Sequence, residues 1–108
     1  MANVTLDGAT ITDWDSFHAQ CLAAFGFPST YAGTMDAWVD CLSYLRDDDN
    51  MTRFCLTPDE VLEIVIEHAE ALKLKAPDLL EEVSFCVGGI NERYDDYGEK
   101  PALKLTLR

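Results

Sequence analysis

Residues 61–66 read Val-Leu-Glu-Ile-Val-Ile, an almost unbroken apolar run in which most side chains are β-branched. Such a run is typical of a strand buried on both faces of a parallel sheet. The preceding residues, Thr57-Pro58-Asp59-Glu60, also fit a helix start, because Pro58 suits the first turn and Glu60 can complete a capping box. Since β-branched side chains favour an extended backbone, we predict a strand over residues 61–66.

Two shorter segments predict the neighbours of this strand. Residues 4–6 alternate between apolar and polar and lead into an Asp7-Gly8 turn signal, and residues 103–108 alternate strictly. Alternation indicates a strand with one buried face. We therefore expect these two strands at the edges of the sheet, with the apolar strand between them.

Apolar residues at helical spacing predict three helices between the strands. The first follows Thr12-Asp13 and ends at Gly26, the second begins at Thr34, and the third runs from Pro77 to Gly98. The predicted buried stripes are, in chain order, Trp14, Phe17, His18, Cys21, Leu22 and Phe25; Met35, Trp38, Val39 and Leu42; and Leu79, Leu80, Val83, Cys86, Val87, Ile90, Tyr94 and Tyr97.

The order strand-helix-helix-strand-helix-strand favours parallel pairing through right-handed crossovers. We predict a small α/β protein with one domain over residues 1–108, a three-stranded parallel sheet and three to four helices. Residues 69–75 are a fourth short helix or an irregular link. Gly88-Gly89 weakens the last helix, which either packs closely there or breaks.

The charge of the chain narrows the classes of partner. Twenty acidic and eight basic side chains give a formal net charge of −12. This charge repels nucleic acid and anionic membrane surfaces, whose binding depends on Lys and Arg. It favours rapid capture of a basic protein by electrostatic steering, although the same charge also serves simple solubility.

The N-terminus has neither a basic run nor a long apolar run, and no stretch reaches the length of a membrane span. We therefore expect a cytoplasmic protein. The four cysteines, Cys21, Cys41, Cys55 and Cys86, are widely spaced and fit no zinc pattern. They are predicted to be reduced, mostly buried thiols, and we predict no metal and no cofactor.

No nucleophile, phosphate-binding or dinucleotide-binding motif is present, so we predict that the protein is not an enzyme. His18 lies on the apolar face of the first helix and is predicted to be a packed histidine. His68 follows the central strand, where sites can form, but the sequence shows no partner for it. The run Asp47-Asp48-Asp49-Asn50 lacks the glycine and distal glutamate of a calcium loop and is predicted to be a solvated loop.

The second helix carries an acidic stripe. Asp36, Asp40, Ser43 and Asp47 are spaced by four, three and four residues, opposite the apolar face. No Lys or Arg within this helix offsets the repulsion between the carboxylates. A basic partner would offset it, and Tyr31 in the preceding loop could add an aromatic contact. The alternative is an ordinary solvated helix face.

Residues 27–42, Phe-Pro-Ser-Thr-Tyr-Ala-Gly-Thr-Met-Asp-Ala-Trp-Val-Asp-Cys-Leu, resemble the barstar family, the intracellular inhibitors of barnase-type ribonucleases. Leu6-Asp7-Gly8, Ile11 and Phe17-His18 also fit the opening of the family pattern. The resemblance implies a barstar-like fold and an inhibitor that places an acidic helix and its preceding loop into the ribonuclease active site.

The resemblance also implies roles for individual residues. Asp40 matches the central inhibitory aspartate of the family, Asp36 a second interface aspartate and Tyr31 an interface tyrosine. Glu92 matches an acidic residue on the last helix. With Ser43 from the acidic stripe, these five residues are the predicted partner-binding site.

Three positions depart from the family pattern. Thr30 stands where another aromatic residue is common, and Gly33 stands where an acidic residue occurs. Trp38 comes one position early, with Val39 at the usual tryptophan site. The first hypothesis is a ribonuclease inhibitor whose partner is a secreted, basic, barnase-type ribonuclease. The second is a binding module for a different toxin or a basic protein that is not a nuclease, and the third is a small enzyme that uses His68 or the acidic stripe.

Overall fold

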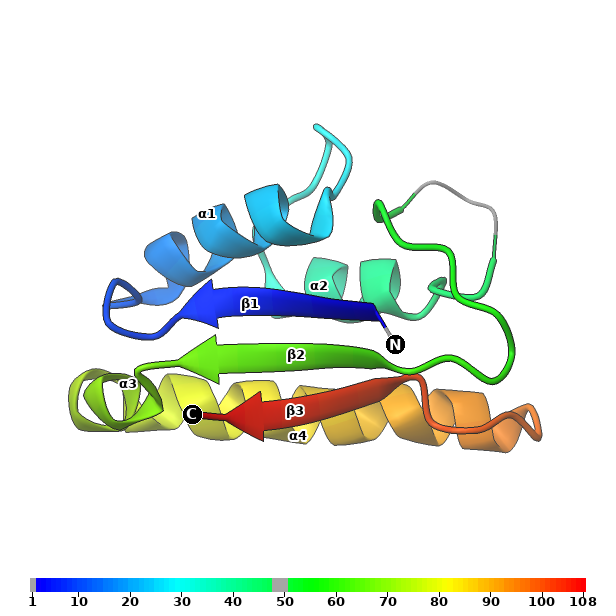
Figure 1. Cartoon of the computed structure of the whole chain (residues 1–108). Coiled ribbons are helices and arrows are strands. Elements are labelled where there is room, and N and C mark those ends of the chain that lie inside the picture. Colours follow the sequence, from blue (N-terminus) through cyan, green and yellow to red (C-terminus); the bar gives the residue numbers. More distant parts are fainter. Residues whose placement is uncertain (1, 48–50) are drawn as a thin grey trace.

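The apolar run forms the central strand, β2 (Leu62–Glu67), of a three-stranded sheet in the computed structural model, which describes residues 2–47 and 51–108 (Figure 1). β2 pairs in parallel with β1 (Ala2–Asp7) on one side and with β3 (Leu103–Leu107) on the other. Residues 57–60 form a turn, in which the Thr57 amide donates to Glu60 Oε1 at 2.9 Å. The predicted strand, its central place and the parallel sheet are therefore confirmed.

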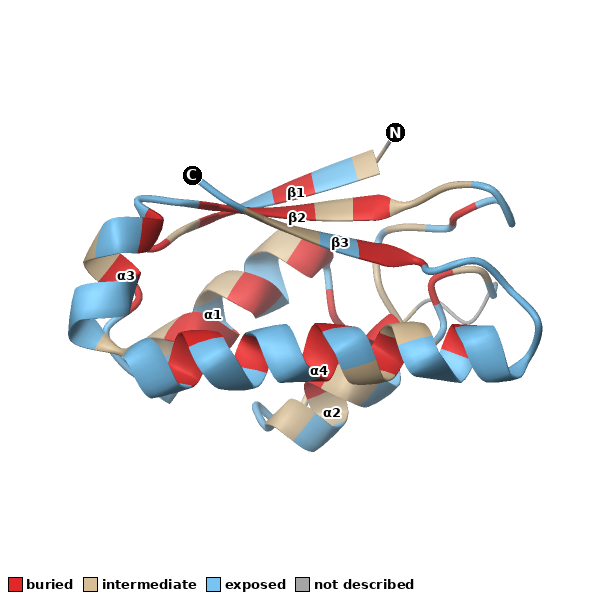
Figure 2. Cartoon of the chain, turned by 90° about the horizontal axis from the view of Figure 1, so that it is seen from below, coloured by how far each residue is buried: buried red, intermediate tan, exposed pale blue. Residues whose placement is uncertain are grey.

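All helices of the described chain lie on one side of this sheet, where α1 and α4 contact it and α2 and α3 pack against α4 (Figure 2). The buried side chains that point toward the helices are Val4, Leu6, Leu62, Ile64, Ile66 and Leu103. On the other face, Glu63 is half-buried and Glu67 is exposed, so the predicted burial of this strand on both faces is confirmed only in part. Val65 is buried there because the edge strands place Thr5 and Thr106 beside it.

α1 (Trp14–Phe25) begins with a capping box, in which the Asp13 carboxylate accepts from the Ser16 amide at 2.8 Å. It ends at Gly26, which adopts the left-handed conformation at φ 68°. Phe17, His18, Cys21 and Phe25 are buried as predicted, whereas Trp14 and Leu22 lie at the margin of the stripe and are exposed.

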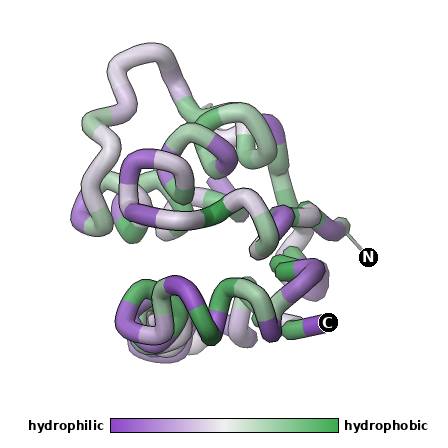
Figure 3. The backbone as a smooth tube through the Cα atoms, turned by 90° about the vertical axis from the view of Figure 1, so that its left-hand side faces the viewer, coloured by the Kyte–Doolittle hydropathy of each residue, from purple (hydrophilic) through white to green (hydrophobic). Residues whose placement is uncertain are grey.

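α2 (Met35–Leu42) is short, and α3 (Ala69–Lys75) shows that the ambiguous link is a helix. α4 (Pro77–Asp96) is long and runs through Gly88-Gly89 without a break. The α4 stripe is buried from Leu79 to Tyr94, but Tyr97 is exposed because the helix ends before it. Hydrophobic and hydrophilic segments alternate along the helices, as expected for elements with one buried face (Figure 3).

The core between α1, α2 and the sheet contains an aromatic cluster. Trp38 of α2 lies 6.1 Å from Phe17 and 6.2 Å from Phe25, measured between ring centroids. Cys21, Cys41 and Cys86 are buried, as predicted, and Cys55 is exposed; all four are free thiols in this structure. Burial raises the pKa of the Cys21 thiol to about 12, so this side chain packs as a neutral apolar group.

Candidate functional site

The exposed face of α2 presents two carboxylates on a firmly anchored helix. Thr34 caps the helix, its Oγ1 accepting from the Ala37 amide at 3.2 Å, and Asp36 occupies the first turn, where the helix dipole favours an anion. Trp38 and Leu42 are buried on the opposite face. Asp36 and Asp40 are both exposed, and the Asp40 side chain keeps 67% of its surface accessible.

The predicted four-residue stripe is wrong at its far end. α2 ends at Leu42, and Ser43 is the C-cap, where its amide donates to the Asp40 carbonyl at 3.1 Å. The Ser43 hydroxyl donates to the Val39 carbonyl at 2.6 Å. Asp47 lies beyond the helix, and residues 48–50 of the predicted acidic loop lie outside the described residues. The stripe therefore consists of Asp36 and Asp40 on α2 and Ser43 at its C-cap.

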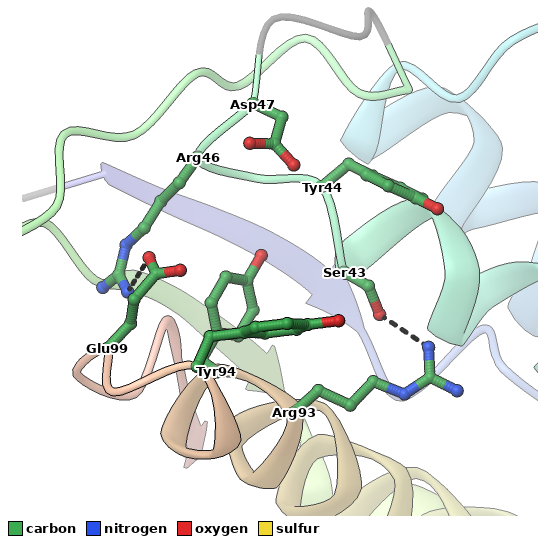
Figure 4. A pocket seen from close by; sticks show the side chains of 8 residues that line it. Ser43, Tyr44, Arg46, Asp47, Arg93, Tyr94 and Glu99 are labelled. Carbon is green, nitrogen blue, oxygen red and sulfur yellow. Dashed lines mark hydrogen bonds and ion pairs between the residues drawn. The ribbon is translucent and has the colours of Figure 1, made fainter.

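Arg93 of α4 lies beside the acidic stripe, and the sequence reasoning missed this contact. Its Nη1 donates to Ser43 Oγ at 3.1 Å (Figure 4). The same Nη1 lies 3.8 Å from Asp40 Oδ1. The absence of Lys and Arg holds within α2, but α4 packs beside α2 and supplies a cation. Helical spacing within α4 could not reveal this contact, because it depends on how two helices lie against each other.

Glu92 precedes Arg93 on α4 and is exposed. Its carboxylate makes no hydrogen bond or ion pair to any residue within 2–47 or 51–108. α4 therefore carries neighbouring charges of opposite sign near the acidic face, one of which contacts α2.

Tyr31 lies in the loop before α2 and is tied to α1. Its Oη forms a 2.6 Å hydrogen bond with His18 Nδ1, and its ring centroid lies 4.5 Å from that of Phe27. Burial raises the pKa of Tyr31 and lowers the pKa of His18, so both side chains are neutral near pH 7. His18 is thus the packed histidine that the sequence predicts.

Tyr31 and Asp40 share a shallow hollow of about 150 Å³ between the loop and α2. Its lining residues are Pro28, Thr30, Tyr31, Ala32, Ala37, Asp40, Cys41 and Met51. The structure therefore brings Tyr31, Asp36, Asp40 and Ser43 to one surface, with Arg93 added and Glu92 on the neighbouring helix.

A larger hollow of about 340 Å³ lies beyond Ser43, between the C-terminal ends of α2 and α4 (Figure 4). Its lining residues are Ser43, Tyr44, Arg46, Asp47, Arg93, Tyr94, Tyr97 and Glu99. Arg46 is structural, because only 5% of its side chain is accessible and its guanidinium donates to the carbonyls of Glu60, Lys100 and Pro101.

His68 lies away from this surface, where β1 and β2 end. Its Nδ1 is 3.0 Å from Asp7 Oδ1, and both side chains are largely exposed. Within residues 2–47 and 51–108, no three His, Cys, Asp or Glu side chains are grouped to hold a metal ion. None of the helices described is long and apolar enough to cross a membrane.

Comparison with known protein families identifies the family of this chain. Comparison with the curated proteins gives no match. The family described as Barstar (barnase inhibitor) matches residues 1–106, which is nearly the whole chain. The match agrees with the three-stranded parallel sheet, the four helices and the motif at residues 27–42. The chain therefore belongs to the barstar family.

Proposed function

We propose that this protein is a ribonuclease inhibitor that binds a basic endoribonuclease and blocks its active site with α2 and the preceding loop. The observation that carries the proposal is the exposure of Asp36 and Asp40 on a helix whose other face is fixed in the core. Membership of a family of barnase inhibitors and the net charge of −12 support it. The partner would be a secreted barnase-type ribonuclease, and the inhibitor would act in the cytoplasm.

The geometry suggests how the inhibitor works. A ribonuclease active site holds cations where it binds phosphates, and two carboxylates on a rigid helix can occupy such places without ordering a flexible segment. The loop carrying Tyr31 would lie beside them, held by its hydrogen bond to His18. Long-range attraction would accelerate association, so binding should weaken as salt screens the charges.

The test is inhibition of a barnase-type ribonuclease at low and physiological salt by the wild type, Asp40→Asn and Glu70→Gln. Glu70 is an exposed residue of α3, so Glu70→Gln removes the same charge away from α2. Removing one partner of a charge pair buried in an interface costs about 2–5 kcal/mol or more, and the barnase–barstar complex is itself a worked example of such pairs. We expect Asp40→Asn to weaken inhibition roughly 100-fold and Glu70→Gln about twofold at most.

Equal inhibition by Asp40→Asn and Glu70→Gln would contradict the mechanism. No inhibition by the wild type would favour a second function, binding of a different toxin or of a basic protein that is not a nuclease. The exposed Thr30 and Gly33, which depart from the family pattern, favour this alternative. Recovery of such a protein on the immobilised wild type, and its loss on Asp40→Asn, would establish it.

A further inference from the structure

Arg93 places a positive charge of the protein itself at one end of the acidic face, which is formed by Asp36, Asp40 and Ser43. Its Nη1 contacts Asp40 and donates to Ser43 Oγ, while the Ser43 hydroxyl proton is used by the Val39 carbonyl. A partner cation that approached Asp40 from the Ser43 side would therefore meet a guanidinium. Asp36, one turn earlier, has no hydrogen-bond or ion-pair partner within the described ranges.

The position of Arg93 is set by the core. Ile90 and Tyr94, on either side of Arg93 in α4, are buried, and Tyr94 Oη donates to the Leu42 carbonyl at 3.2 Å. The same Oη accepts from the Leu45 amide at 3.1 Å, so α4 is fastened to the C-terminal end of α2. Arg93 keeps 53% of its side chain accessible, and the dipole of α2 favours a cation at this end.

We propose that Arg93 is a specificity-determining residue: it acts as an internal cation on Asp40 and Ser43 that a partner must displace or accommodate. The proposal rests on the proposed function, since it describes the same face. A partner that presents only cations to this face is repelled by Arg93 next to the site where it would bind Asp40. A partner that places an oxygen acceptor next to its cation can bind Asp40 and receive the guanidinium, so this pattern of charge is favoured.

The experiment measures inhibition of a barnase-type ribonuclease by the wild type, Arg93→Gln and Lys104→Gln. Lys104 is exposed on the open face of the sheet, so both variants remove one positive charge and differ only in place. Two cations a few ångströms apart near a protein surface repel strongly enough to change affinity roughly tenfold. We expect Arg93→Gln to inhibit about tenfold more tightly than Lys104→Gln, and the gain to fall below about twofold in an Asp40→Asn background.

Equal or weaker inhibition by Arg93→Gln than by Lys104→Gln would overturn the proposal. If no variant inhibits the enzyme, the proposed function fails, and binding of a fluorescent hexa-arginine peptide decides the role of Arg93. Tighter peptide binding by Arg93→Gln than by Lys104→Gln would then support it, and equal binding would overturn it as well. Thermal unfolding of both variants checks that each is folded.

Discussion

The carboxyl ends of the strands and the exposed face of α2 use similar residues in opposite ways. In open parallel sheets, ligands commonly bind in the crevice outside the carboxyl ends of the strands. In this protein that corner is filled: the Gly8 amide donates to the Glu67 carbonyl at 2.7 Å, and the Lys75 ammonium donates to the Ala9 carbonyl at 3.0 Å. The two hollows described above are lined by other residues.

The carboxylates of the two regions also differ: the one at the corner has partners, and those on α2 are exposed to solvent. At the corner, Asp7 is paired with His68. The pKa of the Asp7 carboxyl group is lowered, mainly by the hydrogen bond from the Ala9 amide and next by that from His68. On α2, Asp36 is left to solvent and Asp40 is contacted only at 3.8 Å. A closed corner suits stability, and a projecting acidic face suits binding of a partner with a concave site or cleft. The function proposed above thus lies on a helix surface and not at the sheet edge.

Filling the corner further should have the largest effect on stability. A Cβ at Gly8 would lie 2.7 Å from the Glu67 carbonyl oxygen and 2.8 Å from that of His68, and backbone atoms cannot move aside cheaply. We expect Gly8→Ala to lower the free energy of unfolding by about 2–3 kcal/mol, measured by urea denaturation.

The matched control is Gly88→Ala on α4, where an added Cβ would meet nothing within 4 Å. Because alanine favours a helix over glycine, Gly88→Ala should raise the free energy of unfolding by about 1 kcal/mol. Two glycine substitutions of the same size would then move stability in opposite directions. A stable Gly8→Ala protein would show that the corner has room for a ligand.

The next comparison concerns the loop that supports the acidic face. Tyr31→Phe removes the hydroxyl that bonds to His18 and should lower the free energy of unfolding by about 1 kcal/mol. Tyr97→Phe is the control, because that ring is 83% exposed and its hydroxyl makes no hydrogen bond within the described residues. Equal stability of the two variants would mean that the bond contributes nothing to anchoring the loop.

The burial of His18 predicts a pH dependence of stability. Burial lowers the pKa of His18 in the folded state, so protonation favours the unfolded chain. The free energy of unfolding should therefore fall as the pH drops below the ordinary histidine value of about 6.5. Asp7 and Asp13, whose pKa values are also lowered, lose their contributions only below about 3.8. His18→Gln should flatten the profile between about pH 6.5 and 4, and an unchanged slope would assign it to other groups.

These contrasts show where sequence reasoning succeeds. Periodicity depends on one element at a time, so β2, the buried stripe of α4 and the pairing of Trp38 with Leu42 on one face of α2 could be predicted. The degree of burial on the second face of β2 could not be predicted, because it depends on which face of the sheet the helices cover (Figure 2). The contact between Arg93 and Asp40 was missed for the same reason, since it joins residues far apart in the chain.

The smallest effect is expected at His68. The His68 side chain is 63% exposed and its pair with Asp7 is screened by solvent, so His68→Asn should change the free energy of unfolding by about 0.5 kcal/mol or less. Asparagine tolerates the left-handed backbone that His68 adopts at φ 54°, which removes strain as a cause of any change. The inhibition constant of His68→Asn for a barnase-type ribonuclease should equal that of the wild type, whereas Asp40→Asn should weaken inhibition roughly 100-fold. If His68→Asn lost inhibition without losing stability, the filled corner would be part of the binding surface, and the contrast between the two regions would fail.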